Sequence, residues 1–317
     1  MTRINAETAG LVLLTGAAGF TGGHVLRVLA RAGYRLAVLQ HRTPLPADLV
    51  RLCERVTVGD IREPHVRNAA LDRVDVVCHL SAYIPKRMDD LHEANLCNQI
   101  NALALMDFAE EAAERGVRRF VQVSGANMYA PSDIPCTESA PVFPAQLGTA
   151  YLVSKFAGEV YLSNVAKRTG MEAVVLRVAT PYGPGEPTKK VIPMFLRMAA
   201  EGKPLRLVNG GVLRFSYVYV ADVAASVLNA VAGGPCGIYN IASGEHTSLL
   251  ELAQLVIALQ GGRDASLNIE PVVPGAFTGF PPVSIEKARQ TWRFEPRPLS
   301  VGLRQYRDYL VGRGASA

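Results

Sequence analysis

Tyr151 and Lys155 stand four residues apart, in the order Tyr-Leu-Val-Ser-Lys. Within a helix this spacing places both side chains on one face. A tyrosine ordinarily titrates near pH 10, and a neighbouring ammonium group favours its charged form; lowering the pKa by about three units needs roughly 4 kcal/mol. The pair predicts a general acid or base that exchanges a proton with a substrate oxygen. Without further context, such a pair more often lies on the solvent-exposed surface of a helix and has no catalytic role.

A glycine-rich turn gives the pair its context. Residues 11–15 form an apolar stretch typical of a buried strand, and residues 21–32 have a helical pattern. Between them, Gly16 allows a tight turn, Gly19 lets the backbone approach a diphosphate, and Gly22 permits close packing of helix on strand. An ordinary glycine-rich turn is the alternative. We expect a dinucleotide to contact Gly16, Ala18, Gly19, Phe20, Thr21 and Gly22.

The end of the second strand indicates which dinucleotide binds. NAD-binding proteins usually place an acidic residue there to bind the ribose hydroxyls. This chain has Gln40, His41 and Arg42 instead. An arginine at this point suits a 2′-phosphate, so the sequence favours NADP and leaves NAD open, since Arg42 pointing into solvent is the alternative.

Further cofactor contacts are expected at the ends of the next two strands. Asp60 and Ile61 follow the third strand and are candidates for contact with the adenine. Leu80, Ser81 and Ala82 end the fourth strand and are expected to lie along the cofactor. With a nicotinamide cofactor present, its cationic ring joins the ammonium group in favouring the Tyr151 phenolate. Tyr151 is then expected to transfer the proton while hydride moves, and Lys155 to hold the nicotinamide ribose as well.

Strands and helices alternate along the first half of the chain. We expect strands at 11–15, 36–39, 56–58, 74–80, 120–124 and 174–178, and helices at 21–32, 93–115 and 150–168. This alternation predicts an α/β fold with a Rossmann-type, doubly wound parallel sheet covered by helices on both faces.

From Thr180 onward prolines interrupt the chain often, and helices at 192–201, 220–232 and 249–260 are joined by longer loops. Residues 265–282 read as irregular. We expect a smaller, partly interleaved substrate domain made of 180–209 and 246–317. The Rossmann domain is then 1–179 with parts of 210–245.

Composition excludes several other classes. The net charge is +5, but the basic residues are scattered, which argues against nucleic-acid binding. The five cysteines are far apart, so no metal site is expected. Neither a signal peptide nor an apolar run long enough to span a membrane is recognisable. We expect a cytoplasmic enzyme.

The sequence resembles the extended short-chain dehydrogenases/reductases, the NAD-dependent epimerase/dehydratase family. The resemblance covers residues 11–310 and rests on several motifs in the right order. They are Thr15–Gly22, Asp60-Ile61, residues 79–82, Asn101, residues 116–124, Tyr151 with Lys155, and the later segments 177–184, 219–222, 239–244 and 292–296.

The resemblance implies roles for individual residues. Tyr151, Lys155 and Ser124 match the catalytic region, and Asn101 and Val178 add to the cofactor contacts. Substrate contacts are implied at Lys86, Asn127, Thr180, Arg197 and Arg214. The usual substrates of the family are nucleoside-diphosphate sugars, and the usual assembly is a homodimer built from two long helices.

Three departures from the family pattern bear on the reaction. Gly125 stands where the family usually has Ser or Thr to bond the reacting oxygen, which leaves Ser124, Asn127 or a water as substitutes. Ala126 and Asn127 replace the Asp-Glu pair of sugar 4,6-dehydratases, so elimination of water is disfavoured. The family often binds the substrate diphosphate with two arginines, but Phe215 stands at the first position and residues 273–275 contain no arginine for the second. Arg214, Arg197 or Lys86 are then the candidates to bind the diphosphate. A substrate without a diphosphate is the alternative.

The sequence therefore favours an NADPH-dependent reductase of a keto-sugar nucleotide, of the 4-ketoreductase type. A nucleoside-diphosphate-sugar 4-epimerase with tightly bound NAD is the alternative. A dinucleotide-binding regulatory protein without catalysis is a third, more distant hypothesis, which Gly125 supports and the Tyr151–Lys155 pair opposes.

Overall fold

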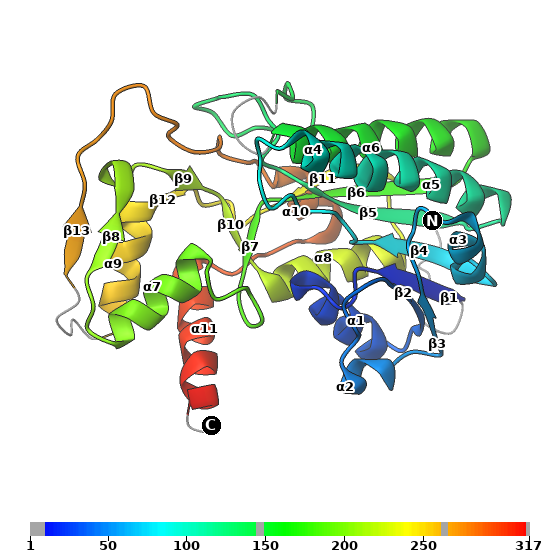
Figure 1. The fold of residues 1–317 in the computed structure, drawn as a ribbon, viewed down its shortest axis with the longest axis horizontal. Helices are drawn as coiled ribbons and strands as arrows, with labels where there is room; N and C mark the ends of the chain where they lie inside the picture. Colours follow the sequence, from blue (N-terminus) through cyan, green and yellow to red (C-terminus); the bar gives the residue numbers. More distant parts are fainter. Residues whose placement is uncertain (1–9, 144–148, 261–265, 315–317) are drawn as a thin grey trace.

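A seven-stranded sheet forms the larger of two lobes. The computed structural model describes residues 10–143, 149–260 and 266–314. The strand order is β11-β6-β5-β4-β1-β2-β3, and every pairing is parallel (Figure 1). The strands are β1 (Leu11–Thr15), β2 (Arg35–Gln40), β3 (Arg55–Val58), β4 (Val74–His79), β5 (Arg119–Gly125), β6 (Glu172–Val178) and β11 (Gly237–Ile241). This confirms the predicted Rossmann-type fold.

The strand order reverses between β1 and β4, because the chain runs outward from β1 to β3 and then returns to the other side of β1. At such a point the connections leave the carboxyl ends of neighbouring strands in opposite directions, and a crevice for ligands opens there. The site residues predicted after β1, β2, β3 and β4 all belong to this edge of the sheet.

Helices cover both faces of the sheet, as the apolar strands require. On one face lie α1 (Phe20–Arg31) and α8 (Val220–Ala232), which pack on each other, and on the opposite face lie α5 (Ala104–Glu114) and α6 (Thr149–Thr169) (Figure 1). Each face has its own buried cluster, with Val12 and Leu14 of β1 on one side and Leu11 and Leu13 on the other. Short helices α2 (Ala47–Val50) and α3 (Pro64–Ala70) complete these layers.

The single helix expected over residues 93–115 is three consecutive segments. They are α4 (Leu91–Cys97), a π-helical turn (Asn98–Leu103) and α5. The wider turn lies against α6 where Gly158 has no side chain, since a Cβ there would stand 2.8 Å from the Asn101 carbonyl oxygen. Single π-helical turns are often found at functional sites, and this one carries Asn101.

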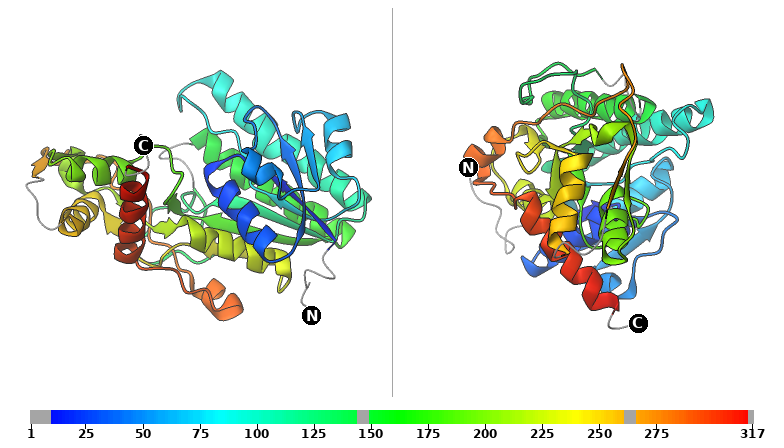
Figure 2. Two further views of the ribbon diagram at one scale, coloured as in Figure 1. Left: turned by 90° about the horizontal axis from the view of Figure 1, so that it is seen from below. Right: turned by 90° about the vertical axis from the view of Figure 1, so that its left-hand side faces the viewer.

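The smaller lobe has a separate buried cluster that includes Phe195, Leu205, Tyr217 and Leu252. Figure 2 shows the two lobes side by side, with α11 in red in the smaller one. Its elements are β7 (Thr180–Tyr182), α7 (Val191–Ala200), β8 (Leu205–Leu207), a 3-10 turn (Val208–Gly211), β9 (Arg214–Phe215), β10 (Tyr217–Tyr219), β12 (Thr247–Ser248), α9 (Leu249–Leu259), β13 (Leu267–Ile269) and α11 (Leu299–Gly314).

Two details differ from the expected organisation. Within the stretch read as irregular, Leu267–Ile269 forms β13, which pairs in parallel with β8. Residues 283–294, expected in the substrate domain, include α10 (Glu286–Trp292), and Ile285, Ala288 and Phe294 pack in the core of the larger lobe. The sequence missed this because short amphipathic segments do not reveal which lobe they cover. No helix within the described residues is both long enough and apolar enough to span a membrane.

Candidate active site and cofactor site

The glycine turn after β1 has the geometry that its glycines require. Gly16 has a φ of +75°, and a Cβ there would stand 2.8 Å from the backbone nitrogen of Ser81. A Cβ on Gly22 would stand 2.0 Å from the Gly16 carbonyl oxygen, so only glycine permits this contact. Gly19 is exposed at the start of α1, whose N–H groups can donate hydrogen bonds to a bound anion. This cradle fits the diphosphate of a dinucleotide.

The end of β4 lies directly beside the turn, as predicted. Leu80 and Ser81 donate their backbone N–H groups to the backbone oxygen and the Oγ1 of Thr15, each at 3.2 Å. The Thr15 hydroxyl also forms a 2.9 Å hydrogen bond with Nδ1 of His79. Burial, with the nearby charge of Lys155, lowers the pKa of His79 to about 3 and keeps its ring neutral. Leu80, Ser81 and Ala82 are half-buried beyond this anchor.

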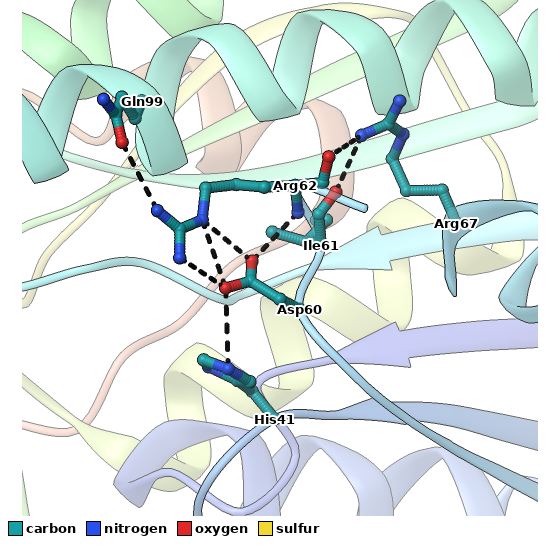
Figure 3. Close-up of polar contacts among 6 residues, drawn as sticks. All are labelled: His41, Asp60, Ile61, Arg62, Arg67 and Gln99. Carbon is teal, nitrogen blue, oxygen red and sulfur yellow. Dashed lines mark hydrogen bonds and ion pairs between the residues drawn. The ribbon is translucent and has the colours of Figure 1, made fainter. Parts of the chain in front are cut away.

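Asp60 lies among basic side chains at the ends of β2 and β3 (Figure 3). Arg62 binds both carboxylate oxygens, with its Nη2 2.6 Å from Oδ2 and its Nε 3.1 Å from each oxygen. His41 stands 3.6 Å from the same Oδ2. These partners, Arg62 above all, lower the pKa of Asp60. The structure brings Asp60 and His41 together, while exposed Arg42 makes no hydrogen bond or ion pair with any described residue.

A buried arginine holds this turn in place. Arg67 of α3 donates from Nη1 to the carbonyl oxygens of Ile61 and Arg62, at 3.0 and 2.9 Å (Figure 3). Its guanidinium is anchored by Glu111 of α5 at 2.6 Å, and its side chain is 4% exposed. Because both carbonyl oxygens point to Arg67, the turn after β3 has one orientation before any ligand binds.

Tyr151 and Lys155 occupy the first turns of α6. Lys155 is buried and makes no hydrogen bond or ion pair with a described residue, so its ammonium is free to hold a ribose. Burial lowers the pKa of Lys155 to about 8. Burial, with a smaller contribution from Cys97, raises the pKa of Tyr151 to about 12, opposite in direction to the lowering expected from neighbouring positive charge. At neutral pH Tyr151 is therefore protonated.

Asn101 connects the π-helical turn to the helix that carries Tyr151. Its Nδ2 donates to the Ser154 hydroxyl at 3.1 Å and to the Tyr83 carbonyl oxygen at 2.9 Å. Ser154 in turn donates to the Tyr151 carbonyl oxygen at 2.7 Å. The side chain that the resemblance assigns to the cofactor is thus used here to fix the first turn of α6 against the loop after β4.

The position after Ser124 has room for a side chain. A Cβ on Gly125 would find only Leu152 Cδ2 of α6 within 4 Å, at 3.8 Å, so the missing side chain would point to the helix beside Tyr151. The Ser124 and Thr180 hydroxyls are buried without a hydrogen-bond partner among the described residues. Asn127 is half-buried. Val178 lies opposite Gly125 in the β5–β6 pairing and accepts the Ala126 N–H at 2.9 Å.

The three basic residues proposed for the substrate diphosphate differ in their availability. Arg214 donates to the His246 carbonyl oxygen at 2.9 Å and pairs with Glu251 at 3.1 Å, so its guanidinium is already engaged. Arg197 and Lys86 are exposed and form no side-chain hydrogen bond or ion pair with a described residue, although the charge of Glu201 acts on Arg197 and that of Glu93 on Lys86. The neighbour of Arg214, Phe215, lies among aromatic rings, with centroids 5.8 Å from Tyr217 and 5.9 Å from Phe280.

The roles of three residues in this region were not assigned from the sequence. The role of Arg62 was detectable, because it follows Asp60 by two positions and such spacing permits a local ion pair. The roles of Arg67 and of His79, which lies in the 79–82 motif, were not, because they depend on partners more than 40 positions away. No group of three or more potential metal ligands occurs within the described ranges.

Comparison with known proteins identifies the same family that the sequence motifs indicated. The model of the NAD dependent epimerase/dehydratase family matches residues 12–242. A dTDP-4-dehydro-6-deoxy-D-allose reductase of a Streptomyces species is 28% identical over 311 residues, which cover 93% of this chain and 94% of the reductase.

Two solved structures share the fold over nearly the whole chain. UDP-glucose 4-epimerase of Thermotoga maritima, solved with UDP-glucose, is 24% identical with a TM-score of 0.84, covering 96% of this chain and 99% of its own. The Thermus thermophilus UDP-glucose 4-epimerase complex with NAD is 26% identical with a TM-score of 0.82, covering 95% of this chain and 99% of its own.

Proposed function

The chain belongs to the NAD dependent epimerase/dehydratase family, the extended short-chain dehydrogenases/reductases, and from this premise we propose that it reduces the keto group of a nucleotide sugar with NADPH. The observation that carries the proposal is the charge at the ends of β2 and β3. Arg42 and Arg62 contribute two positive charges and Asp60 one negative charge, and His41 adds another positive charge when it is protonated. A 2′-phosphate is favoured over a hydroxyl in such surroundings.

The cofactor identity bears on the reaction, because a reductase consumes its reduced dinucleotide whereas an epimerase regenerates it. Asp60 does not offset this preference. Arg62 and His41 already occupy its carboxylate, so it is a poor acceptor for the ribose hydroxyls that an NAD-binding acid would hold.

The state of Tyr151 suits a proton donor. A bound NADPH would supply hydride to the carbonyl carbon of the substrate. The carbonyl oxygen then takes the electron pair of the C=O bond, and Tyr151 donates its phenolic proton to that oxygen to give the alcohol. Tyr151 is protonated at neutral pH, and Lys155, with its pKa of about 8, is then still largely charged and stabilises the phenolate that forms.

The relatives support the proposed substrate class. The Streptomyces relative is a reductase of a dTDP-linked keto-sugar. In this chain, exposed Arg197 and Lys86 are the candidates to contact the diphosphate, since Arg214 is paired with Glu251. Asn127 and the unpartnered hydroxyls of Ser124 and Thr180 are the candidates to bind the sugar.

The test is a cofactor balance. We expect purified protein to consume NADPH stoichiometrically with one member of a panel of dTDP- and UDP-linked 4-keto-sugars, and to use NADH less well. The 26% identity to an epimerase solved with NAD makes sugar-nucleotide 4-epimerisation the second candidate. Isomerisation of UDP-glucose at catalytic protein concentrations, without net NADPH loss on any keto-sugar, would reject the reductase.

We further propose a homodimer formed through α6 and the π-helical turn beside it. Leu103, Val153 and Val160 expose 42 to 47% of their surface there, and exposed apolar patches mark sites of protein association. Val160→Glu would place two charges in a two-fold interface. We expect light scattering to find a dimer for the natural protein and a monomer for the variant; a natural protein that is monomeric at micromolar concentration contradicts this proposal.

A further inference from the structure

A chain of buried polar side chains begins one helical turn beyond Lys155. Glu159 of α6 pairs with Arg177 of β6, with 2.7 Å between Oε2 and Nη2, and both side chains are 3% exposed. Arg177 also donates through Nε to both Glu159 oxygens, at 3.0 and 3.2 Å. Such a pair needs every partner in place, because a buried charge that loses its partner is strongly destabilising.

The pair is anchored to three further segments. Arg177 Nη1 donates to the Tyr129 hydroxyl at 3.0 Å, and Tyr129 donates onward to Oδ1 of Asn240 in β11 at 2.6 Å. Nδ2 of Asn240 donates to the carbonyl oxygens of Cys136 and Ser284, each at 3.1 Å. Glu159 is therefore fixed, through Arg177, from β6, β11 and the connections that carry Tyr129, Cys136 and Ser284.

Glu159 also acts on Lys155. The two residues are four apart on α6, so they share a helix face. Burial lowers the pKa of Lys155, and the Glu159 carboxylate is the charge that opposes this lowering.

The other ionisable groups around Lys155 do not supply this charge. Tyr151 on the same helix is protonated, His79 on β4 is neutral, and burial raises the pKa of Cys97 on α4, which keeps that thiol protonated. On α5, the acids Asp107 and Glu111 pair with Arg67, and Glu110 pairs with Arg168.

We propose that Glu159, held by its ion pair with Arg177, is a positioning residue of the active site: its buried carboxylate keeps Lys155 charged in a dry environment. This inference rests on the proposed role of Lys155 at the nicotinamide ribose. It assigns a function to a buried ion pair that acts through Lys155.

The test measures NADPH affinity as a function of pH, through the fluorescence of the bound reduced nicotinamide. In the natural protein we expect full affinity below about pH 8 and a decline above it, as Lys155 loses its proton. In Glu159→Gln the decline should begin about one pH unit lower, since a nearby opposite charge shifts a pKa by about that much or more. Glu159→Asp should restore most of the shift.

Tyr129→Phe is the matched control, because it weakens the same network and leaves the Glu159 charge in place. It should lower the melting temperature and leave the pH midpoint unchanged. If Glu159→Gln does not fold, Glu159→Gln with Arg177→Met removes both charges and should still move the midpoint down.

An unmoved midpoint in a folded Glu159 variant would overturn the inference. So would an equal shift in Tyr129→Phe, because the effect would then come from loosened packing. A natural protein that binds no NADPH at any pH would instead contradict the proposed function on which the inference rests.

Discussion

Asp60 and Arg62, two positions apart on the turn after β3, form a bidentate ion pair in which Nη2 lies 2.6 Å from Oδ2. The ion pair changes how Asp60 acts on a ligand at this edge of the sheet. An aspartate that would otherwise repel a phosphate is neutralised, and with Arg42 nearby the edge keeps a positive charge. His41, 3.6 Å from the same carboxylate, adds to it when protonated.

Arg62→Gln is expected to lower the preference for NADPH over NADH. Without Arg62 the Asp60 carboxylate loses its ion-pair partner and repels a 2′-phosphate. Interactions between charged groups contribute about 1.5 to 3 kcal/mol, so the ratio of the two affinities should fall by roughly 10- to 100-fold. Titrations with both cofactors, and with 2′-AMP against 5′-AMP, measure this. Arg118→Gln, at the exposed amino end of β5, removes the same charge elsewhere and should leave the ratio unchanged. Equal weakening of both cofactors by Arg62→Gln would disprove the assignment.

Tyr151→Phe is expected to reduce kcat by at least about 100-fold while NADPH affinity changes little, because proton transfer by a positioned group contributes about 10²- to 10⁴-fold. The variant removes one hydroxyl and keeps the aromatic ring. Single-turnover kinetics on the identified keto-sugar check this. Full activity in Tyr151→Phe would mean that another group donates the proton.

Gly125→Ser is expected to fold normally and to raise kcat. The nearest atom to an added Cβ is Leu152 Cδ2 at 3.8 Å, an ordinary van der Waals contact, so there is room for the side chain. The new hydroxyl would add a donor beside Tyr151, where charge develops on the reacting oxygen. Gly125→Ala adds the Cβ without the donor and is the control. A fall in activity in both variants would instead show that the substrate itself occupies the space at Gly125.

Lys155→Met is expected to stabilise the fold at pH 7 while abolishing activity. The folded protein holds Lys155 with a pKa of about 8 against an ordinary 10.5, so the unfolded chain binds its proton more tightly. This pKa difference corresponds to about 3 kcal/mol in the free energy of unfolding, by which the buried, charged Lys155 destabilises the fold below pH 8. The natural protein should recover this stability as the pH rises from about 8 to 10.5, and the advantage of the variant should vanish above that range.

Urea unfolding of both proteins at pH 7 and at pH 10.5 measures the difference. Lys167→Met, at an exposed position of the same helix, should show no such pH dependence. A Lys155→Met variant no more stable than the natural protein at pH 7 would indicate that the ammonium is better solvated than its burial suggests.

Features that depend on neighbouring residues were predictable from the sequence. The glycines of the turn after β1 were identified because a strand, a tight turn and a helix each have a local pattern, and the structure places Gly16, Gly19 and Gly22 as expected. The alternation of strands and helices determined the parallel sheet, because parallel strands need helical crossovers. The spacing of Tyr151 and Lys155 likewise put both on one helix.

Features that depend on distant partners were decided only by the tertiary structure. Burial reverses the expected shift in the pKa of Tyr151, and it lowers that of Lys155. Arg67 meets Glu111 across 44 positions, and Asn101 meets Ser154 across 53. The physical reason is that the charge state and orientation of a side chain depend on what excludes water from it and what bonds to it. Those neighbours are set by the packing of α6, β4 and the π-helical turn, which no local pattern encodes.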